Sequence, residues 1–145
     1  MAWLALGLAA LAVWVALSTG VYMVSAPSNT VQAMAQLIAQ QEGFGVPGAI
    51  PTDYHNPGDL TNWPGYPTGD RGQGNITIFP DDATGWKALY TDLTVHLALN
   101  PNQSLDSFIQ SYAEQPPGSS YAQAVAQGLG VSIDTPLSQI STANG

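Results

Sequence analysis

The chain of 145 residues contains no cysteine and only two basic side chains, against ten acidic ones. Without cysteine it can form no disulfide, thiol nucleophile or thiolate metal site. Two cations cannot neutralise a run of phosphates, so we expect no binding to nucleic acid. The net charge is −8, yet only 8% of the residues are charged and 45% are hydrophobic. This imbalance indicates that part of the chain is not exposed to water.

The amino-terminal segment accounts for the imbalance. Residues 3–24 carry no charge, and a helix of that length would be about 33 Å long. The hydrocarbon core of a bilayer is about 30 Å thick, so we predict one transmembrane anchor within residues 1–25, which contacts lipid through residues 3–24. A cleaved signal peptide is the alternative, but the basic segment that normally begins one is missing.

Residues 26–142 are predicted to form one mostly helical α+β domain. Apolar periodicity and capping residues predict helices over residues 29–41, 82–99, 104–112 and 119–128, and a further helix start at residues 134–136. Residues 75–80 alternate as a short strand does. Residues 43–74 are too rich in glycine and proline for a long regular element, and a loop of that length within a compact domain is usually functional.

Glutamate is rare, with only Glu42 and Glu114 in the chain. Glu42 falls at the predicted end of the first of these helices, beside Gly43 and Phe44. Apolar neighbours and the negative end of the helix dipole would both raise the pKa of its carboxyl group. A carboxyl group that is protonated near neutral pH can donate a proton to a glycosidic oxygen. A solvated glutamate at a helix end is the alternative.

The loop that follows interleaves aromatic rings with polar side chains, an arrangement that suits a polysaccharide. The rings are Tyr54, Trp63 and Tyr66, and the polar residues are Asp53, Asn56, Asp59 and Asn62. The alternative is that the rings only cover the core beneath an irregular loop.

Three stretches of this region resemble phage-associated lysozyme-like muralytic domains: residues 41–44 (QEGF), 46–51 (VPGAIP) and 55–60 (HNPGDL). Further matches follow in the same order at residues 78–80, 83–89, 105–113 and 130–132, so the resemblance covers about residues 33–137. It implies a lysozyme-like fold and cleavage of peptidoglycan at the β-1,4 bond between N-acetylmuramic acid and N-acetylglucosamine. It also implies that Glu42 is the acid/base residue.

The resemblance places the turn of the family motif at residues 56–58, where we expect it to shape the floor of a cleft. We expect substrate contacts from Asp53, Tyr54, His55, Asn56, Asp59, Trp63 and Tyr66. The chain departs from the motif in three places: His55 and Asp59 each stand where the family has asparagine, and Thr61 stands where it has a basic residue.

Two mechanisms remain open. A lytic transglycosylase needs one carboxyl group, first as acid and then as base, whereas an inverting hydrolase needs a second carboxylate, for which Asp53 and Asp59 are candidates. We favour the lyase because the family motif brings no obvious second acid. Neither HExxH nor EF-hand spacing occurs, so no metal or other cofactor is expected. His96, on the helix predicted over 82–99, is expected to be a surface or core histidine.

The sequence therefore predicts a single-pass membrane enzyme that degrades peptidoglycan. The favoured location is the internal membrane of a phage virion, where it would open the cell wall during genome delivery; a bacterial inner membrane, facing the periplasm, is the alternative. Expected partners are peptidoglycan strands, lipid and other virion membrane or capsid proteins. The rival hypothesis is an inactive lysozyme-like structural protein of a virion membrane that binds glycan or capsid partners.

Overall fold

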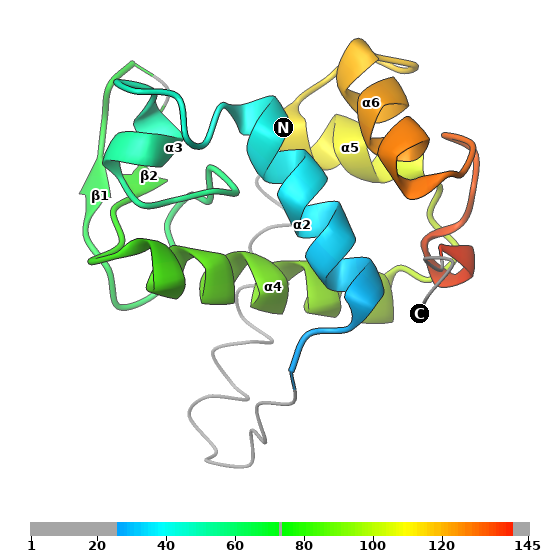
Figure 1. The fold of residues 1–145 in the computed structure, drawn as a ribbon, viewed down its shortest axis with the longest axis horizontal. Helices are drawn as coiled ribbons and strands as arrows, with labels where there is room; N and C mark the ends of the chain where they lie inside the picture. Colours follow the sequence, from blue (N-terminus) through cyan, green and yellow to red (C-terminus); the bar gives the residue numbers. More distant parts are fainter. Residues whose placement is uncertain (1–25, 73, 141–145) are drawn as a thin grey trace.

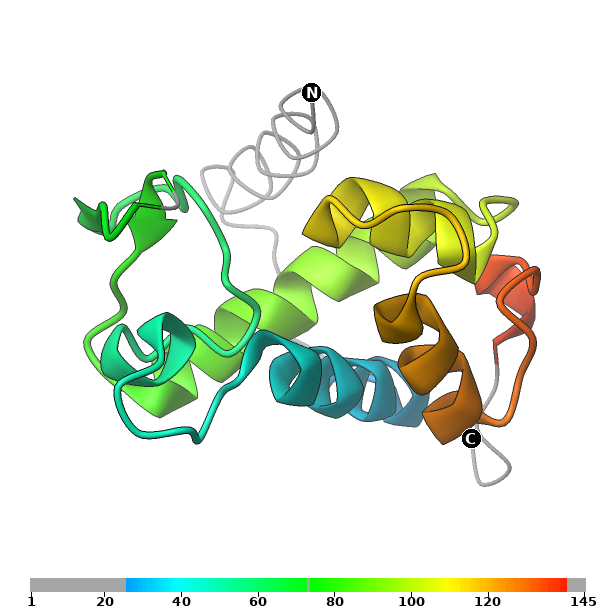
Figure 2. The same ribbon diagram turned by 90° about the horizontal axis from the view of Figure 1, so that it is seen from above.

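The computed structural model describes residues 26–72 and 74–140, and it is mostly helical with one small sheet. The elements are α2 (Asn29–Glu42), α3 (Ile50–Asp53), β1 (Thr68–Gly69), β2 (Ile76–Thr77), α4 (Asp82–Leu99), α5 (Leu105–Ala113), α6 (Ser120–Leu129) and the 3-10 helix η1 (Leu137–Gln139). This composition confirms the predicted mostly helical α+β class. Figures 1 and 2 show α3 and the two strands at one end of the molecule, α5 and α6 at the other, and α4 running beneath both.

The helices begin where the sequence offers a capping oxygen. Ser28 accepts a hydrogen bond from the backbone N–H of Val31 at 3.2 Å, and Asp81, Ser104 and Ser119 cap α4, α5 and α6 in the same way. Such caps satisfy backbone donors that have no partner within the helix. The four long helices therefore lie close to their predicted bounds.

Residues 43–74 hold two short elements that the sequence pattern did not reveal. Helix α3 is a single turn with Pro51 near its start, where a missing N–H costs nothing. Strand β1 pairs antiparallel with β2, with Thr68 opposite Thr77 and Gly69 opposite Ile76. The strand predicted over 75–80 is thus confirmed only at residues 76–77, because the partner segment supplies two residues.

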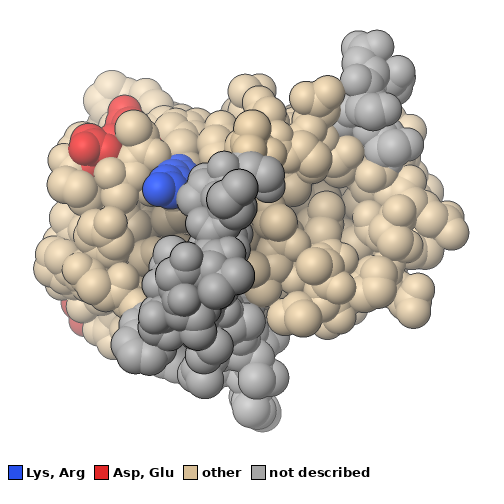
Figure 3. Space-filling view, turned by 90° about the horizontal axis from the view of Figure 1, so that it is seen from below, with Lys and Arg blue, Asp and Glu red and all other residues tan. Residues whose placement is uncertain are grey.

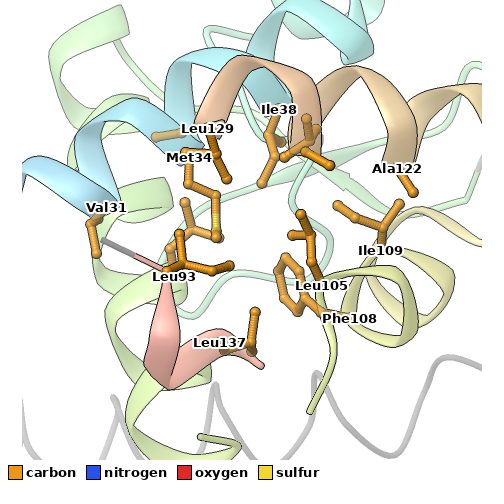
Figure 4. Close-up of a cluster of buried hydrophobic side chains, with 14 of the residues drawn as sticks. Val31, Met34, Ile38, Leu93, Leu105, Phe108, Ile109, Ala122, Leu129 and Leu137 are labelled. Atoms are coloured by element: carbon orange, nitrogen blue, oxygen red, sulfur yellow. The ribbon is translucent and has the colours of Figure 1, made fainter. Parts of the chain in front are cut away.

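The main hydrophobic core lies among α2, α4, α5, α6 and η1. Figure 4 shows the side chains of these elements pointing toward one another, among them Met34, Leu93, Phe108 and Leu137, each at most 1% exposed. A second, smaller cluster is formed by Leu60, Phe79 and Ala88 at the end of the molecule that carries the sheet. Few charged side chains lie on the face drawn in Figure 3, in keeping with the composition.

The predicted membrane anchor, residues 1–25, lies outside the described part of the chain. Within residues 26–72 and 74–140, none of the helices combines the length and the hydropathy needed to cross a bilayer.

Candidate active site

Glu42 is the last residue of α2, and the glycine that follows it ends the helix. Gly43 adopts a left-handed conformation, with φ of +88°, and its N–H caps the carbonyl groups of the last turn. The Glu42 carboxyl group is partly buried, and its Oε1 accepts a hydrogen bond of 2.8 Å from the hydroxyl group of Tyr121, in the first turn of α6. Because α2 packs on α6, this bond joins two elements of the main core.

Burial raises the pKa of Glu42 to about 7. The hydrogen bond from Tyr121 acts in the opposite direction, because it stabilises the carboxylate, while the negative charge of Asp59 adds to the rise. The prediction that this glutamate has a raised pKa is therefore confirmed, and burial is the main cause. A carboxyl group with a pKa near 7 can both give and take a proton under ordinary conditions.

Asp59 is the second carboxyl group of the site. It follows the turn at residues 56–58 in a left-handed conformation, with φ of +51°, which is uncommon outside glycine. Burial raises its pKa, and its buried Oδ1 has no hydrogen-bond partner among the described residues. The charge of Asp59 also raises the pKa of Tyr121. Glu42, Asp59 and Tyr121 thus form one electrostatically coupled group.

The turn that carries Asp59 is held by buried hydrogen bonds. The side chain of Asn56 is fully buried, donates to the carbonyl oxygens of Leu60 and Thr77, both at 2.9 Å, and accepts from the N–H of Leu60 at 2.8 Å. The prediction that Asn56 contacts substrate is therefore wrong for its side chain, because this bonding leaves nothing exposed. Asn56 instead fixes the turn, as expected for a residue that shapes the floor of a site.

Asp53 is placed differently from Asp59. It ends α3 with an exposed side chain, and its Oδ2 accepts a hydrogen bond of 2.7 Å from Arg71. Arg71 also lies over the ring of Tyr54, with its guanidinium carbon 6.0 Å from the ring centroid. Of the two acids considered for the second carboxylate, only Asp59 is electrostatically coupled to Glu42.

His55 faces α4. Its Nδ1 lies 2.6 Å from Oδ1 of Asp82, in the first turn of that helix. Its backbone has φ of +52°, and its carbonyl group comes so close to α4 that a Cβ on Gly85 would overlap the oxygen. His55 is thus tied to α4.

The three aromatic rings of the loop cover the smaller hydrophobic cluster or the sheet beside it. Trp63 packs on the cluster, Tyr66 meets Phe79 edge-on with centroids 5.1 Å apart, and the hydroxyl of Tyr54 lies against Gly69. Tyr66 remains 37% exposed, and the other two are partly exposed. These rings therefore cover the core and also keep surface that a ligand can reach.

His96 is a core histidine, one of the two alternatives predicted for it. It lies 7% exposed on α4, with Nε2 at 3.6 Å from Oδ2 of Asp92, which is itself 2% exposed. Neither of these two atoms has a hydrogen-bond partner among the described residues. Burial raises the pKa of Asp92 to about 7 and lowers that of His96. Because both pKa shifts favour the neutral form, Asp92 and His96 form a nearly neutral pair in the core.

Sequence reasoning missed two tyrosines at the site. Tyr121 bonds to Glu42, and the hydroxyl of Tyr112 donates to the carbonyl oxygen of Gly58 at 2.6 Å. Both lie in helices at positions that read as ordinary core, and their partners are far away in the chain. The sequence contains no local signal for either bond.

Among residues 26–72 and 74–140, no group of three or more histidine, aspartate or glutamate side chains is placed to hold a metal ion. Comparison of the chain with protein-family models, curated proteins and solved structures found no match.

Proposed function

We propose that this protein is a membrane-anchored peptidoglycan-degrading enzyme that cleaves the β-1,4 bond between N-acetylmuramic acid and N-acetylglucosamine. The observation that carries the proposal is the state of Glu42: its pKa is near 7, and the carboxyl group is held by Tyr121 and lies in the field of Asp59. A partly buried carboxyl group that is still about half protonated at pH 7 can act as the acid that glycoside cleavage requires. The resemblance of residues 41–60 to muralytic domains supports this substrate class.

In the favoured mechanism the enzyme acts as a lytic transglycosylase. Glu42 donates its proton to the glycosidic oxygen, the bond from that oxygen to C1 of the muramic acid breaks, and positive charge develops at C1. The Glu42 carboxylate then removes the proton of the sugar's own 6-hydroxyl group, whose oxygen bonds to C1 and closes a 1,6-anhydro ring. The proton returns to Glu42, so the cycle needs no cofactor. The negative charge of Asp59 would stabilise the positively charged intermediate stage.

A lysozyme-type hydrolase is the second candidate, and the placement of Asp59 favours it. An inverting hydrolase uses one acid and one carboxylate that activates water. Asp59 is electrostatically coupled to Glu42, and its Oδ1 has no hydrogen-bond partner within residues 26–72 and 74–140. Its raised pKa argues in the other direction, because a base must be ionised at the working pH. The lyase and the hydrolase are therefore distinguished by the chemical ends of the fragments they release, not by which residues are present.

The setting we propose is the internal membrane of a phage virion, with residues 3–24 as the anchor and the domain acting on the wall during genome delivery. A bacterial inner membrane is the alternative location. An inactive structural protein that binds glycan or capsid partners remains the competing function, and the experiment below separates it from the enzyme.

The test incubates the full-length chain, in detergent micelles, with purified peptidoglycan sacculi and analyses the released fragments by mass spectrometry. Anhydro-muropeptides support the lyase, and fragments with reducing muramic acid ends support the hydrolase. Glu42→Gln should abolish release, whereas Glu114→Gln, at the only other glutamate and in an exposed position, should leave it unchanged. If the native chain releases nothing although it binds the sacculi, the enzymatic proposal fails and the structural role takes its place.

A further inference from the structure

Tyr112 connects the two ends of the domain. It lies on α5, yet its hydroxyl group donates a hydrogen bond of 2.6 Å to the carbonyl oxygen of Gly58, which is 54 positions earlier in the chain. Its ring packs against both the main core and the smaller cluster of Leu60, Phe79 and Ala88. A movement of α5 would therefore be transmitted directly to the turn at residues 56–58.

The turn has little freedom to move away from this contact. A Cβ on Gly58 would come within 2.7 Å of the Tyr112 hydroxyl and 2.6 Å of Leu89, so any larger residue would have to displace both side chains. On the other side, Asn56 holds the turn from within, and its carbonyl oxygen accepts the N–H of Asp59 at 3.1 Å. The backbone at Asp59 is thus held by two hydrogen bonds, one from Tyr112 to the Gly58 carbonyl and one from its own N–H to the Asn56 carbonyl. Its side-chain Oδ1 has no hydrogen-bond partner in the described part of the chain.

We propose that Tyr112 is a positioning residue of the site, whose hydroxyl group fixes the backbone position of Asp59 by way of the Gly58 carbonyl and so sets how strongly the charge of Asp59 acts on Glu42. Its catalytic consequence rests on the proposed function, whereas its electrostatic consequence can be measured without substrate. Tyr112 does not touch the reacting atoms in this role. It determines how strongly the charge of one carboxyl group acts on the other.

The surroundings of Tyr112 keep its hydroxyl group a donor. Burial is the main cause of a pKa well above the ordinary value, and Asp92, Tyr121, Glu42 and Asp59 all add to the rise. These are the titratable groups that act on it from α4, α6, α2 and the turn. Because each of them opposes ionisation, Tyr112 remains protonated while Glu42 and Asp59 titrate. The hydrogen bond from Tyr112 to the Gly58 carbonyl is therefore present whether Glu42 and Asp59 are neutral or ionised.

The test uses the fact that the chain has only two glutamates. Labelling glutamate with ¹³C at the side-chain carboxyl carbon gives two NMR signals, one from Glu42 and one from exposed Glu114, which serves as an internal reference. In the full-length chain in micelles, Tyr112→Phe should lower the pKa of Glu42 measurably, because Asp59 is no longer held in the position from which its charge raises that pKa. Tyr121→Phe should change it in the opposite direction, because that hydroxyl stabilises the carboxylate.

A double-mutant cycle with Asp59→Asn shows whether Tyr112 acts through Asp59. Asp59→Asn alone should lower the pKa of Glu42, and adding Tyr112→Phe should then change it no further. The proposal is overturned if Tyr112→Phe folds but leaves the Glu42 titration unchanged, or if its effect persists in the Asp59→Asn background. If Tyr112→Phe does not fold, 4-fluorophenylalanine at position 112, which nearly keeps the shape without the donor, replaces it in the same cycle.

Kinetics on sacculi then separate this inference from the proposed function. For an active enzyme, Tyr112→Phe should lower kcat about tenfold and leave KM nearly unchanged, because the site and not substrate binding is disturbed. An equal loss in Asp59→Asn and in the double variant supports transmission through Asp59, and additive losses contradict it. A native chain that shows the expected titrations but no activity removes the proposed function and leaves the positioning by Tyr112 standing.

Discussion

The hydroxyl group of Tyr121 donates to Oε1 of Glu42 at 2.8 Å, although 79 positions separate the two residues. A neutral carboxyl group carries its proton on one oxygen only. Because Oε1 accepts the tyrosine hydrogen, the proton of the neutral acid belongs on Oε2. Tyr121 therefore determines which oxygen of Glu42 is the donor, and we expect the glycosidic oxygen to approach Oε2.

Removing this hydroxyl group should move the pH dependence of activity. Tyr121→Phe keeps the ring but deletes a hydrogen bond to a charged group, which is worth about 1.5–3 kcal/mol. The carboxylate loses this stabilisation, so the pKa of Glu42 should rise by about one unit, since one unit corresponds to about 1.4 kcal/mol. In a pH–rate profile, the pH at which the rate falls on the alkaline side should rise by the same amount. A profile that stays in place would show that the bond is absent in solution.

On the proposed function, the native chain should lose muralytic activity as the pH rises through about 7. Glu42 must be protonated to begin the reaction, and burial raises its pKa to about 7. The rate should therefore be nearly constant on the acid side of that value, as long as the protein remains folded, and fall about tenfold per pH unit well above it. Fragment release at controlled ionic strength from pH 5 to 9 gives the profile. Glu114→Gln is the control and should leave the fall in rate above pH 7 in place. A shift of that fall in this variant would show that it does not report the titration of Glu42.

Asn56→Ala should destabilise the domain severely. The substitution leaves the N–H of Leu60 without its acceptor and removes the Asn56 donor from the carbonyl groups of Leu60 and Thr77, although the Leu60 carbonyl still accepts from the N–H of Thr77. An unsatisfied buried group costs about 1–3 kcal/mol, so for the Leu60 N–H and the Thr77 carbonyl we expect a loss of at least about 2 kcal/mol in the free energy of unfolding. Urea denaturation followed by circular dichroism measures it. A loss below about 1 kcal/mol would mean that water reaches the turn.

Asp92 should make the folded state less stable as the pH rises from about 4 to about 7. Burial raises its folded pKa to about 7 from an ordinary value of 3.8, so the unfolded chain releases this proton before the folded chain does. The stabilisation is complete below about pH 4 and is lost progressively up to about pH 7. Asp92→Asn should remove this trend and, at pH 8, stabilise the domain by up to about 4 kcal/mol.

His96 changes the stability with pH in the opposite direction to Asp92, so the measurement has to separate the two contributions. Burial lowers its pKa, so its contribution is lost as the pH falls below the ordinary value of 6.5. Denaturant midpoints at several pH values, for the native chain and for Asp92→Asn, isolate the aspartate. Parallel curves for the two proteins would show that Asp92 has the same pKa in the folded and unfolded states, which would contradict the prediction.

Gly85→Ala should destabilise the protein, although alanine is the better helix former. In an exposed helix this change gains about 1 kcal/mol. In α4, however, the added Cβ would overlap the carbonyl oxygen of His55, which is backbone and cannot turn aside. Gly128→Ala in α6 is the matched control, because its Cβ meets only the movable end of Leu37. Thermal unfolding should show a clearly larger loss at Gly85 than at Gly128.

Much of the helical framework could be predicted because its signals are local. Ser28 and Gly43 cap α2 as residues of their types do in general, and Met34 and Ile38 lie on the buried face that the helical period predicts. Helix α3 and strand β1 were not predicted, because elements of four and two residues leave no periodic pattern. Asn56 was misassigned to substrate binding for a related reason: a polar residue in a loop looks exposed until its partners are known.

The sequence by itself determined the helix boundaries, the scarcity of charge and the candidacy of Glu42, because caps, apolar periodicity and a glycine at a helix end act over a few neighbouring residues. Only the tertiary structure decided that Asp59, and not Asp53, acts on Glu42, and that Tyr121 and Tyr112 hold the two sides of the site. Those relationships join residues far apart in the chain. They arise from how α2, α5 and α6 pack, and packing sets both the burial and the distances that fix the charge of a carboxyl group.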